Sequence, residues 1–202
     1  MPDDPRCNDL LEFWFGTHAD DADVIKDRGA LWFGGGTDVD ASIRTHFGEL
    51  REAAITGLLD DWLVCARGRL ALVILADQFS RNLFRADAHA FAHDELARAW
   101  CEQGLDAGID CDLRPIERVF FYLPLEHSEV LADQQRSVAL FRALLDEVDA
   151  DVRPAFANFL DYAQRHRDII ERFGRFPHRN AALERASTAQ EVAFLAQAGS
   201  SF

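Results

Sequence analysis

One short segment places a histidine between carboxylates that could support acid–base chemistry. Glu126, His127 and Glu129 lie in the stretch YLPLEHSE. An imidazole titrates near neutral pH and carboxylates can orient it, so we predict catalytic roles for these three residues. The competing interpretation is structural, because Ser128 and Glu129 would also stabilise the start of a helix. His178, in a separate segment, is a second candidate acid or base.

Two further segments carry donors that could hold a small anion. The first follows the most apolar stretch of the chain and contributes Asp77, Arg81 and Asn82. The second, FGRFPHRN, contributes Arg175, Arg179 and Asn180. The planar fork of arginine suits carboxylates and phosphates, so we predict these six residues as ligand-binding. Asp77 follows a buried helix and needs a partner, which we expect to be an arginine of the other segment.

The charge distribution singles out the same two regions. The chain has 202 residues, with 21 Lys and Arg, 35 Asp and Glu, and a net charge of -14, which opposes general nucleic-acid binding. Residues 67–85 hold four Arg against one Asp, and residues 153–186 hold seven Arg against four acids, so each stretch has a net charge of +3. These basic stretches either converge on an anion-binding pocket or pair with the acidic surface.

Helical periodicity runs through nearly every segment, so the elements that carry these residues are expected to be helices. Residues 37–57 space their apolar side chains on one helix face, with Gly57 at the end. A second helix is expected from about Asp87 to Gln103, stopped by Gly104, and a third from Pro115 until Pro124.

Three later helices complete this expectation. Ser128 could cap a long helix, Pro154 opens another that Gly174 ends, and Ser187 to Gln190 resembles a capping box. Leu70–Ala76 could be a strand by composition, but no second candidate strand exists to pair with it, so we expect a buried helix. The prediction is an all-α chain of about eight or nine helices, forming one domain over residues 1–202.

Several long stretches resemble the DUF924 family, a bacterial family of unknown function. They are RGRLALVILADQFSRNLFR, ERVFFYLPLEHSE, RHRDIIERFGRFPHRN and STAQEVAFL, and the likeness runs from LLEFWFG at residues 10–16 to nearly the last residue. The resemblance implies a tetratricopeptide-like helical bundle and no established activity. It also implies a glycine where this chain has Glu184, at a turn that a positive φ would suit.

Other classes of site find little support in the residues. His89 and His93 have the i, i+4 spacing of a metal pair on a helix, but no third ligand accompanies them, so we expect no metal site. Nucleotide and hydrolase motifs are also missing, and we expect no cofactor. No signal peptide, no stretch long enough to span a membrane and no CxxC pair occur, so we expect a cytoplasmic protein without a membrane partner.

Two functional hypotheses remain, and the sequence does not decide whether the protein is an enzyme. The first is a small anionic ligand held in a helical cleft lined by Arg, Asn, His and Glu. The second is a helical module that binds a peptide or protein partner. A closed pocket where Arg81, His127 and Arg179 reach one point would favour the first hypothesis, and an open groove with these residues scattered would favour the second. Pairing of all three with Asp or Glu would argue against both hypotheses.

Overall fold

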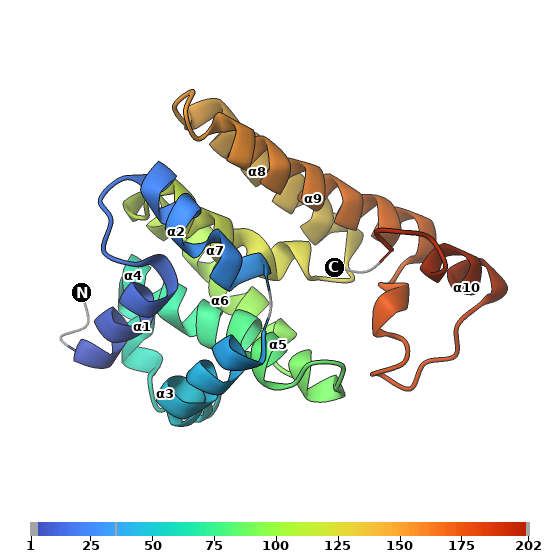
Figure 1. Cartoon of the computed structure of the whole chain (residues 1–202), viewed down its shortest axis with the longest axis horizontal. Helices are drawn as coiled ribbons and strands as arrows, with labels where there is room; N and C mark the ends of the chain where they lie inside the picture. The colour runs from blue at the N-terminus through green and yellow to red at the C-terminus, as the bar shows by residue number, and fades with distance from the viewer. Residues whose placement is uncertain (1–3, 35, 201–202) are drawn as a thin grey trace.

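Every regular element in the described chain is a helix. The computed structural model describes residues 4–34 and 36–200. The helices are α1 (Pro5–Phe15), α2 (Asp21–Phe33), α3 (Thr37–Ile55), α4 (Ala66–Val73), α5 (Phe79–Leu83), α6 (Asp94–Asp106), α7 (Pro115–Glu126), α8 (Leu131–Glu147), α9 (Arg153–Phe173) and α10 (Ala189–Leu195) (Figure 1). Because α4 continues through a π-helical turn into α5, these ten segments of the described chain form nine helices. The predicted all-α class is confirmed.

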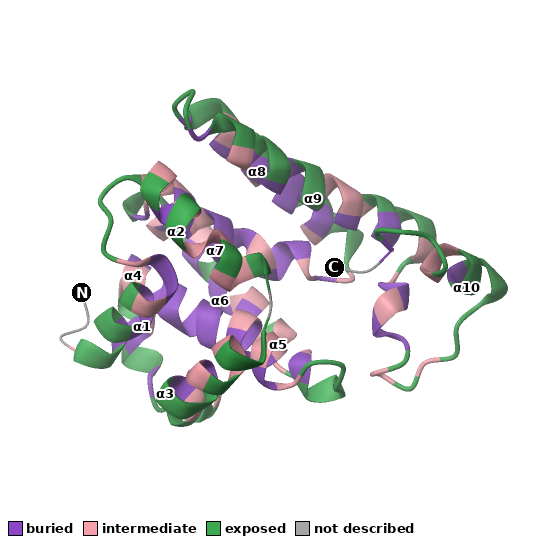
Figure 2. Ribbon diagram, viewed as in Figure 1, coloured by how far each residue is buried: buried purple, intermediate pink, exposed green. Residues whose placement is uncertain are grey.

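The most apolar stretch forms the centre of the core. Leu70 to Ala76 are each 0% exposed and helical. The buried helix expected here, because the sequence offers no second strand to pair with this stretch, is confirmed. Helices α1, α6 and α7 pack against α4, and aromatic side chains fill the space between them, with Trp14 and Phe120 at 5.5 Å between ring centroids. Figure 2 shows the buried colour along these inner helices and the exposed colour on the outer faces of α3 and α8.

A π-helical turn interrupts the central helix where its polar residues begin. It spans Ile74–Gln78, and the Phe79 amide donates to the Ile74 carbonyl, five residues earlier. Such turns are frequent at functional sites because the extra residue redirects the side chains that follow. Here the turn holds Asp77, which is 0% exposed.

The last third of the chain begins with a helical hairpin. Helices α8 and α9 lie side by side, joined by residues 148–152 (Figure 1). Gly174 ends α9 with φ 69°, a left-handed conformation that glycine adopts without strain. A short 3-10 turn, η5 (Pro177–Arg179), follows, and Phe176 packs with Ile169 and Ile170 of α9 in a small apolar cluster. This arrangement presents the second arginine segment beside the end of α9.

Four expected helix boundaries are wrong. Gly104 lies inside α6, where a Cβ would come within 2.6 Å of Phe121, so it permits close packing and does not end the helix. Pro124 lies in the last turn of α7, which continues to Glu126 and closes with the His127 amide donating to the Leu123 carbonyl. Instead of one helix from Asp87, a 3-10 turn at Ala88–Ala90 precedes α6.

The fourth wrong boundary is the start of α8, which begins at Leu131 and is not capped by Ser128. The Ser128 hydroxyl accepts from the Val130 amide at 3.1 Å and donates to Asp133 at 2.6 Å, so it organises the connection before the helix. The capping box of α10 exists one residue later than expected. Thr188 and Glu191 form it, because the Glu191 carboxylate accepts from the Thr188 amide at 2.7 Å.

Candidate functional site

Polar side chains from five segments meet where the central helix ends. The π-helical turn and α5 supply Asp77 and Arg81, α6 supplies Asp94 at its first position, and α7 supplies Glu126 and His127 at its end. Two segments from the last third of the chain complete the group, with His166 on α9 and His178 and Arg179 on η5. We call these eight residues the arginine–histidine cluster.

Asp77 orients two neighbouring side chains at once. The His127 Nδ1 lies 2.7 Å from Asp77 Oδ1, and the Arg81 Nη1 lies 2.9 Å from the same oxygen. Gln78 also donates to the carboxylate, from Nε2 to Oδ2 at 2.5 Å. A carboxylate that accepts the Nδ1 proton of an imidazole leaves the lone pair on Nε2, which is the tautomer that a general base requires.

The ionisation of this pair follows from burial and from the Arg81 charge. Burial alone would raise the pKa of Asp77, but Arg81 and the hydrogen bond to His127 hold it below its usual range. Burial lowers the pKa of His127, and the Arg81 charge lowers it further. At neutral pH Asp77 is therefore an anion and His127 a neutral imidazole.

Asp94 joins the two basic segments. Arg81 donates to its two oxygens from Nη1 at 2.9 Å and from Nη2 at 3.0 Å, and Arg179 donates from Nη1 at 3.2 Å. The guanidinium of Arg179 also lies over two aromatic rings, 4.7 Å from the centroid of Phe91 and 4.5 Å from that of Phe176. Two segments about a hundred residues apart in sequence therefore meet on one carboxylate of the protein.

Arg179 is less fully satisfied than Arg81. It is 6% exposed, the only hydrogen bond of its side chain within the described residues goes to Asp94, and its buried Nε–H has no acceptor there. Burial lowers the pKa of Arg179 to about 10, and the nearby Arg81 charge contributes in the same direction. The cluster thus contains a guanidinium that lacks a carboxylate of its own.

Glu126 and His166 form a buried pair between α7 and α9. The His166 Nδ1 lies 3.1 Å from Glu126 Oε1 and 2.9 Å from the Tyr162 carbonyl. Burial raises the pKa of Glu126 to about 8, and the Asp77 charge adds to this effect. Burial likewise lowers the pKa of His166 to about 3. The pair is therefore neutral at neutral pH, with a proton on the Glu126 carboxyl.

The remaining predicted residues have structural contacts. Glu129 accepts from Arg185 at 2.7 and 3.0 Å and from the Phe176 amide at 2.8 Å. Burial alone would raise the pKa of Glu129, but these donors lower it. His178 lies against the Phe176 ring at 5.5 Å, and burial lowers the pKa of His178 to about 4. Glu129 anchors the η5 segment, and His178 is the second histidine beside Arg179.

Three other predicted ligand residues lie outside the cluster. Arg175 forms a bidentate ion pair with Glu191 at 2.6 and 2.8 Å, which ties the end of α9 to α10. Asn82 donates to Asp40 at 2.8 Å, and Asn180 holds the turn that follows η5 by donating to Ser187 at 3.0 Å. The structure therefore brings Asp77, Arg81 and Arg179 together but leaves these three side chains in separate contacts.

Two specific expectations about partners are wrong. The partner of Asp77 is Arg81 of its own segment, one helical turn away, and not an arginine of the other segment. His89 and His93 do not share a helix face, since His89 lies in a 3-10 turn beside Asp87 and His93 faces Arg51 at 3.1 Å. Among the described residues, no three potential metal-ligating side chains cluster around a common point.

Convergence and acidic pairing occur together in this cluster. Arg81, His127 and Arg179 meet, but each also contacts Asp77 or Asp94, which is the pairing that argues against both functional hypotheses. The pairing is incomplete only at Arg179, whose Nε–H has no acceptor among the described residues. Access is partial, with side-chain exposures of 21% for Arg81, 18% for Asp94 and 14% for His127. Cavities of about 280 and 290 Å³ lie elsewhere on the molecule. A ligand would reach the cluster from its partly exposed edge.

Sequence reasoning missed four members of the site and its surroundings. Asp94 was not predicted as a site residue, because an acid in the first turn of a helix is already explained by its favourable interaction with the helix dipole. His166 lies in the basic segment RHRD but gave no sign of its contact with Glu126. Phe91 and Phe176 read as core aromatics. Both basic segments contain an Arg–Asn pair shortly after a Phe, in Phe79–Asn82 and in Phe176–Asn180, but the spacing differs by one residue and gave only a weak signal.

Comparison with known proteins gives a family but no activity. Residues 10–199 match the model of DUF924, described as a bacterial protein of unknown function. A solved structure, that of the protein of unknown function ATU0120 from Agrobacterium tumefaciens, is similar with a TM-score of 0.78 and 38% identity, covering 94% of this chain and 96% of that one. The comparison with curated proteins found no match. None of the described helices has the length and hydropathy that a bilayer-spanning segment needs.

Proposed function

Since this chain belongs to the DUF924 family of bacterial proteins of unknown function, its activity has to be inferred from its own geometry, and we propose that it binds a small anionic ligand at the arginine–histidine cluster. The ligand would carry a carboxylate or a phosphate. The observation that carries this proposal is Arg179, a buried guanidinium with a single hydrogen bond in the described chain.

The arrangement of Arg179 suits recognition of an anion. The aromatic rings of Phe91 and Phe176 both lie against its guanidinium, and such contacts restrict the orientation of the guanidinium without using its N–H donors. Asp94 occupies one position on this edge and is shared with Arg81. An incoming carboxylate or phosphate oxygen would supply the acceptors that the edge still lacks.

Acid–base chemistry on a bound ligand is the second part of the proposal. His127 is neutral, partly exposed and held by Asp77 in the tautomer with a basic Nε2. Glu126, next to it in sequence, keeps its proton at neutral pH and is the corresponding acid, although it is only 4% exposed. His127 is therefore the residue that we expect to exchange a proton with a ligand held by Arg179.

A thermal-shift screen with inorganic phosphate, acetate and citrate at constant ionic strength tests the binding. A ligand at about a hundred times its Kd adds about 2.7 kcal/mol to the stability of the native state. For a domain of this size, we expect the Tm to rise by about 5–10 °C with at least one of these anions. The Arg179→Met variant keeps the packing between the two rings and removes the donors, so it should lose this rise.

Arg175→Met is the matched control, because it removes one charge from the same segment at a residue paired with Glu191. It should keep the anion-dependent rise. If Arg179→Met is folded and responds as the wild type does, or if none of the three anions raises the wild-type Tm, Arg179 is structural and the proposal is wrong. Should Arg179→Met fail to fold, Arg179→Lys retains the charge without the planar fork and is expected to weaken the response.

A further inference from the structure

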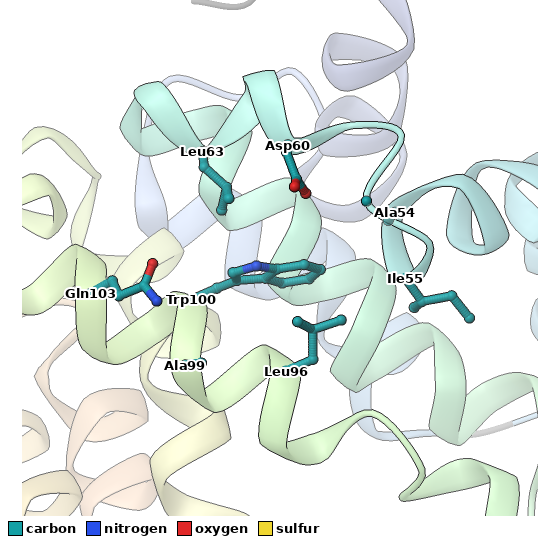
Figure 3. Close-up of a pocket in the computed structure, with 9 residues that line it drawn as sticks. Ala54, Ile55, Asp60, Leu63, Leu96, Ala99, Trp100 and Gln103 are labelled. Atoms are coloured by element: carbon teal, nitrogen blue, oxygen red, sulfur yellow. The ribbon is translucent and has the colours of Figure 1, made fainter.

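A small cavity on another part of the molecule has chemistry opposite to that of the arginine–histidine cluster. It has a volume of about 280 Å³ and lies between the end of α3, the 3-10 turn η1 (Asp60–Val64) and α6 (Figure 3). Six of its nine lining residues are apolar, among them Ile55, Leu63, Leu96 and Trp100, while polar atoms make up about half of the exposed wall. None of its lining residues belongs to the cluster, so its occupant would be a different molecule.

A carboxylate and an indole ring face each other across this cavity. Figure 3 shows the Asp60 oxygens directed toward the ring of Trp100, with Leu63 and Leu96 beside the same ring. Trp100 is 5% exposed, so packing fixes its orientation. Asp60 is exposed and forms no ion pair with any basic side chain in residues 4–34 and 36–200. Its charge is therefore available to an occupant.

The end of helix α3 adds a second negative contribution. The helix is 19 residues long, and its last residues, Ala54 and Ile55, line the cavity together with Gly57. Gly57 has φ 79°, and the amides of Gly57 and Leu58 donate back to the Ala54 and Ala53 carbonyls at 3.1 and 2.9 Å. The carboxyl end of a helix carries partial negative charge, so it favours a cation nearby.

We propose that this cavity binds a small organic cation with apolar substituents, such as a quaternary ammonium group. The indole face attracts the cation through its quadrupole, Asp60 attracts it through full charge, and the aliphatic wall covers its methyl groups. A hydrated inorganic cation fits less well, because Asp60 is the one carboxylate among the lining residues and no three potential metal ligands cluster among the described residues. The volume suits a group of trimethylammonium size rather than a large ligand.

Choline and its neutral carbon isostere, 3,3-dimethylbutan-1-ol, form a matched pair of probes. The two differ in charge and have nearly the same shape. Titration of the full chain, followed by NMR of the tryptophan indole signals, should show saturable shifts with choline, and the Trp100→Phe variant assigns the signal that moves. We expect the neutral alcohol to bind about fivefold more weakly or worse.

Substitutions at adjacent acids separate the Asp60 carboxylate from general negative charge. Asp60→Asn should lower the affinity for choline about fivefold. Asp61→Asn makes the same change in net charge at a residue that does not line the cavity, so it should leave the affinity unchanged. Equal affinity for choline and the alcohol, equal effects of the two substitutions, or no saturable shift with choline would each overturn the proposal. Inorganic phosphate should not compete, so this result is independent of the anion site.

Discussion

Replacing Glu126 by glutamine changes the pH dependence of stability, since the wild-type carboxyl is protonated in the native protein and ionised in the unfolded chain. Burial raises the pKa of Glu126 from 4.5 to about 8. Below about pH 4.5 both states hold the proton, and this group has no effect on stability. As the pH rises toward 8, the unfolded chain loses the proton first, so the wild type loses stability progressively. Glutamine resembles the protonated carboxyl in shape and hydrogen bonding but does not titrate.

The size of this effect follows from the difference between the two pKa values. Each pH unit within the window changes the free energy of unfolding by about 1.4 kcal/mol per proton. Between pH 5 and pH 8 we therefore expect Glu126→Gln to gain about 3–4 kcal/mol relative to the wild type. Urea unfolding at several pH values in this range measures the difference directly, and it requires no knowledge of the ligand.

Glu129→Gln is the control, three residues away. Its carboxylate is bound by Arg185 and the pKa of Glu129 is lowered, so it is ionised in both states throughout this range. The decrease in the free energy of unfolding caused by Glu129→Gln should therefore be the same at pH 5 and at pH 8. A pH-independent difference for Glu126→Gln as well would refute the reasoning, because it would mean that Glu126 is an anion paired with protonated His166. NMR titration of His166, expected to remain neutral in this range, distinguishes the two states of the pair.

Three further substitutions test other parts of the structure. Glu184 is exposed and has φ 52°, so Glu184→Gly should relieve left-handed strain and raise stability by about 0.5–1 kcal/mol in urea unfolding, whereas Glu184→Ala should not. Asp77→Asn leaves Arg81 without its buried counter-charge, and we expect a loss of about 3–5 kcal/mol at pH 7. Because the pKa of Asp77 is lowered in the native state, that loss should shrink as the pH falls below about 4. Gly104→Ala should lower the Tm, since overpacking costs about 1–3 kcal/mol and its Cβ would lie 2.6 Å from Phe121; an unchanged Tm would show that the ring moves freely.

The helical class could be predicted because apolar periodicity is a local property of the chain. The end of α3 and the end of α9 could also be placed, since Gly57 and Gly174 adopt the positive φ that helix ends favour. Gly104 is also a glycine, but the reason for a glycine there is different: a Cβ would have no space beside Phe121 and Arg69. That cause depends on segments distant in sequence, which no local pattern reveals.

The turn at Glu184 shows what family resemblance adds to local reasoning. The expectation of a positive φ came from the glycine that the resemblance implies there, and Glu184 adopts φ 52°. The meeting of Arg81 with Arg179 could likewise be anticipated from the two basic segments. Their shared partner could not, because Asp94 belongs to an acidic region and is brought to them only by the packing of α6.

If the arginine–histidine cluster binds an anion as we propose, its charges would link that binding to proton uptake. Two guanidiniums, Arg81 and Arg179, are balanced by two carboxylates, Asp77 and Asp94, so an added anion would leave an uncompensated negative charge in a partly buried site. The Arg81 charge helps to keep His127 neutral, and a bound anion would offset that charge. Protonation of His127 would then restore the balance. By reciprocity, an anion that raises the pKa of this imidazole is itself bound more tightly when the imidazole is protonated. Under the proposed function, His127 would therefore both exchange a proton with the ligand and make the affinity for the anion dependent on pH.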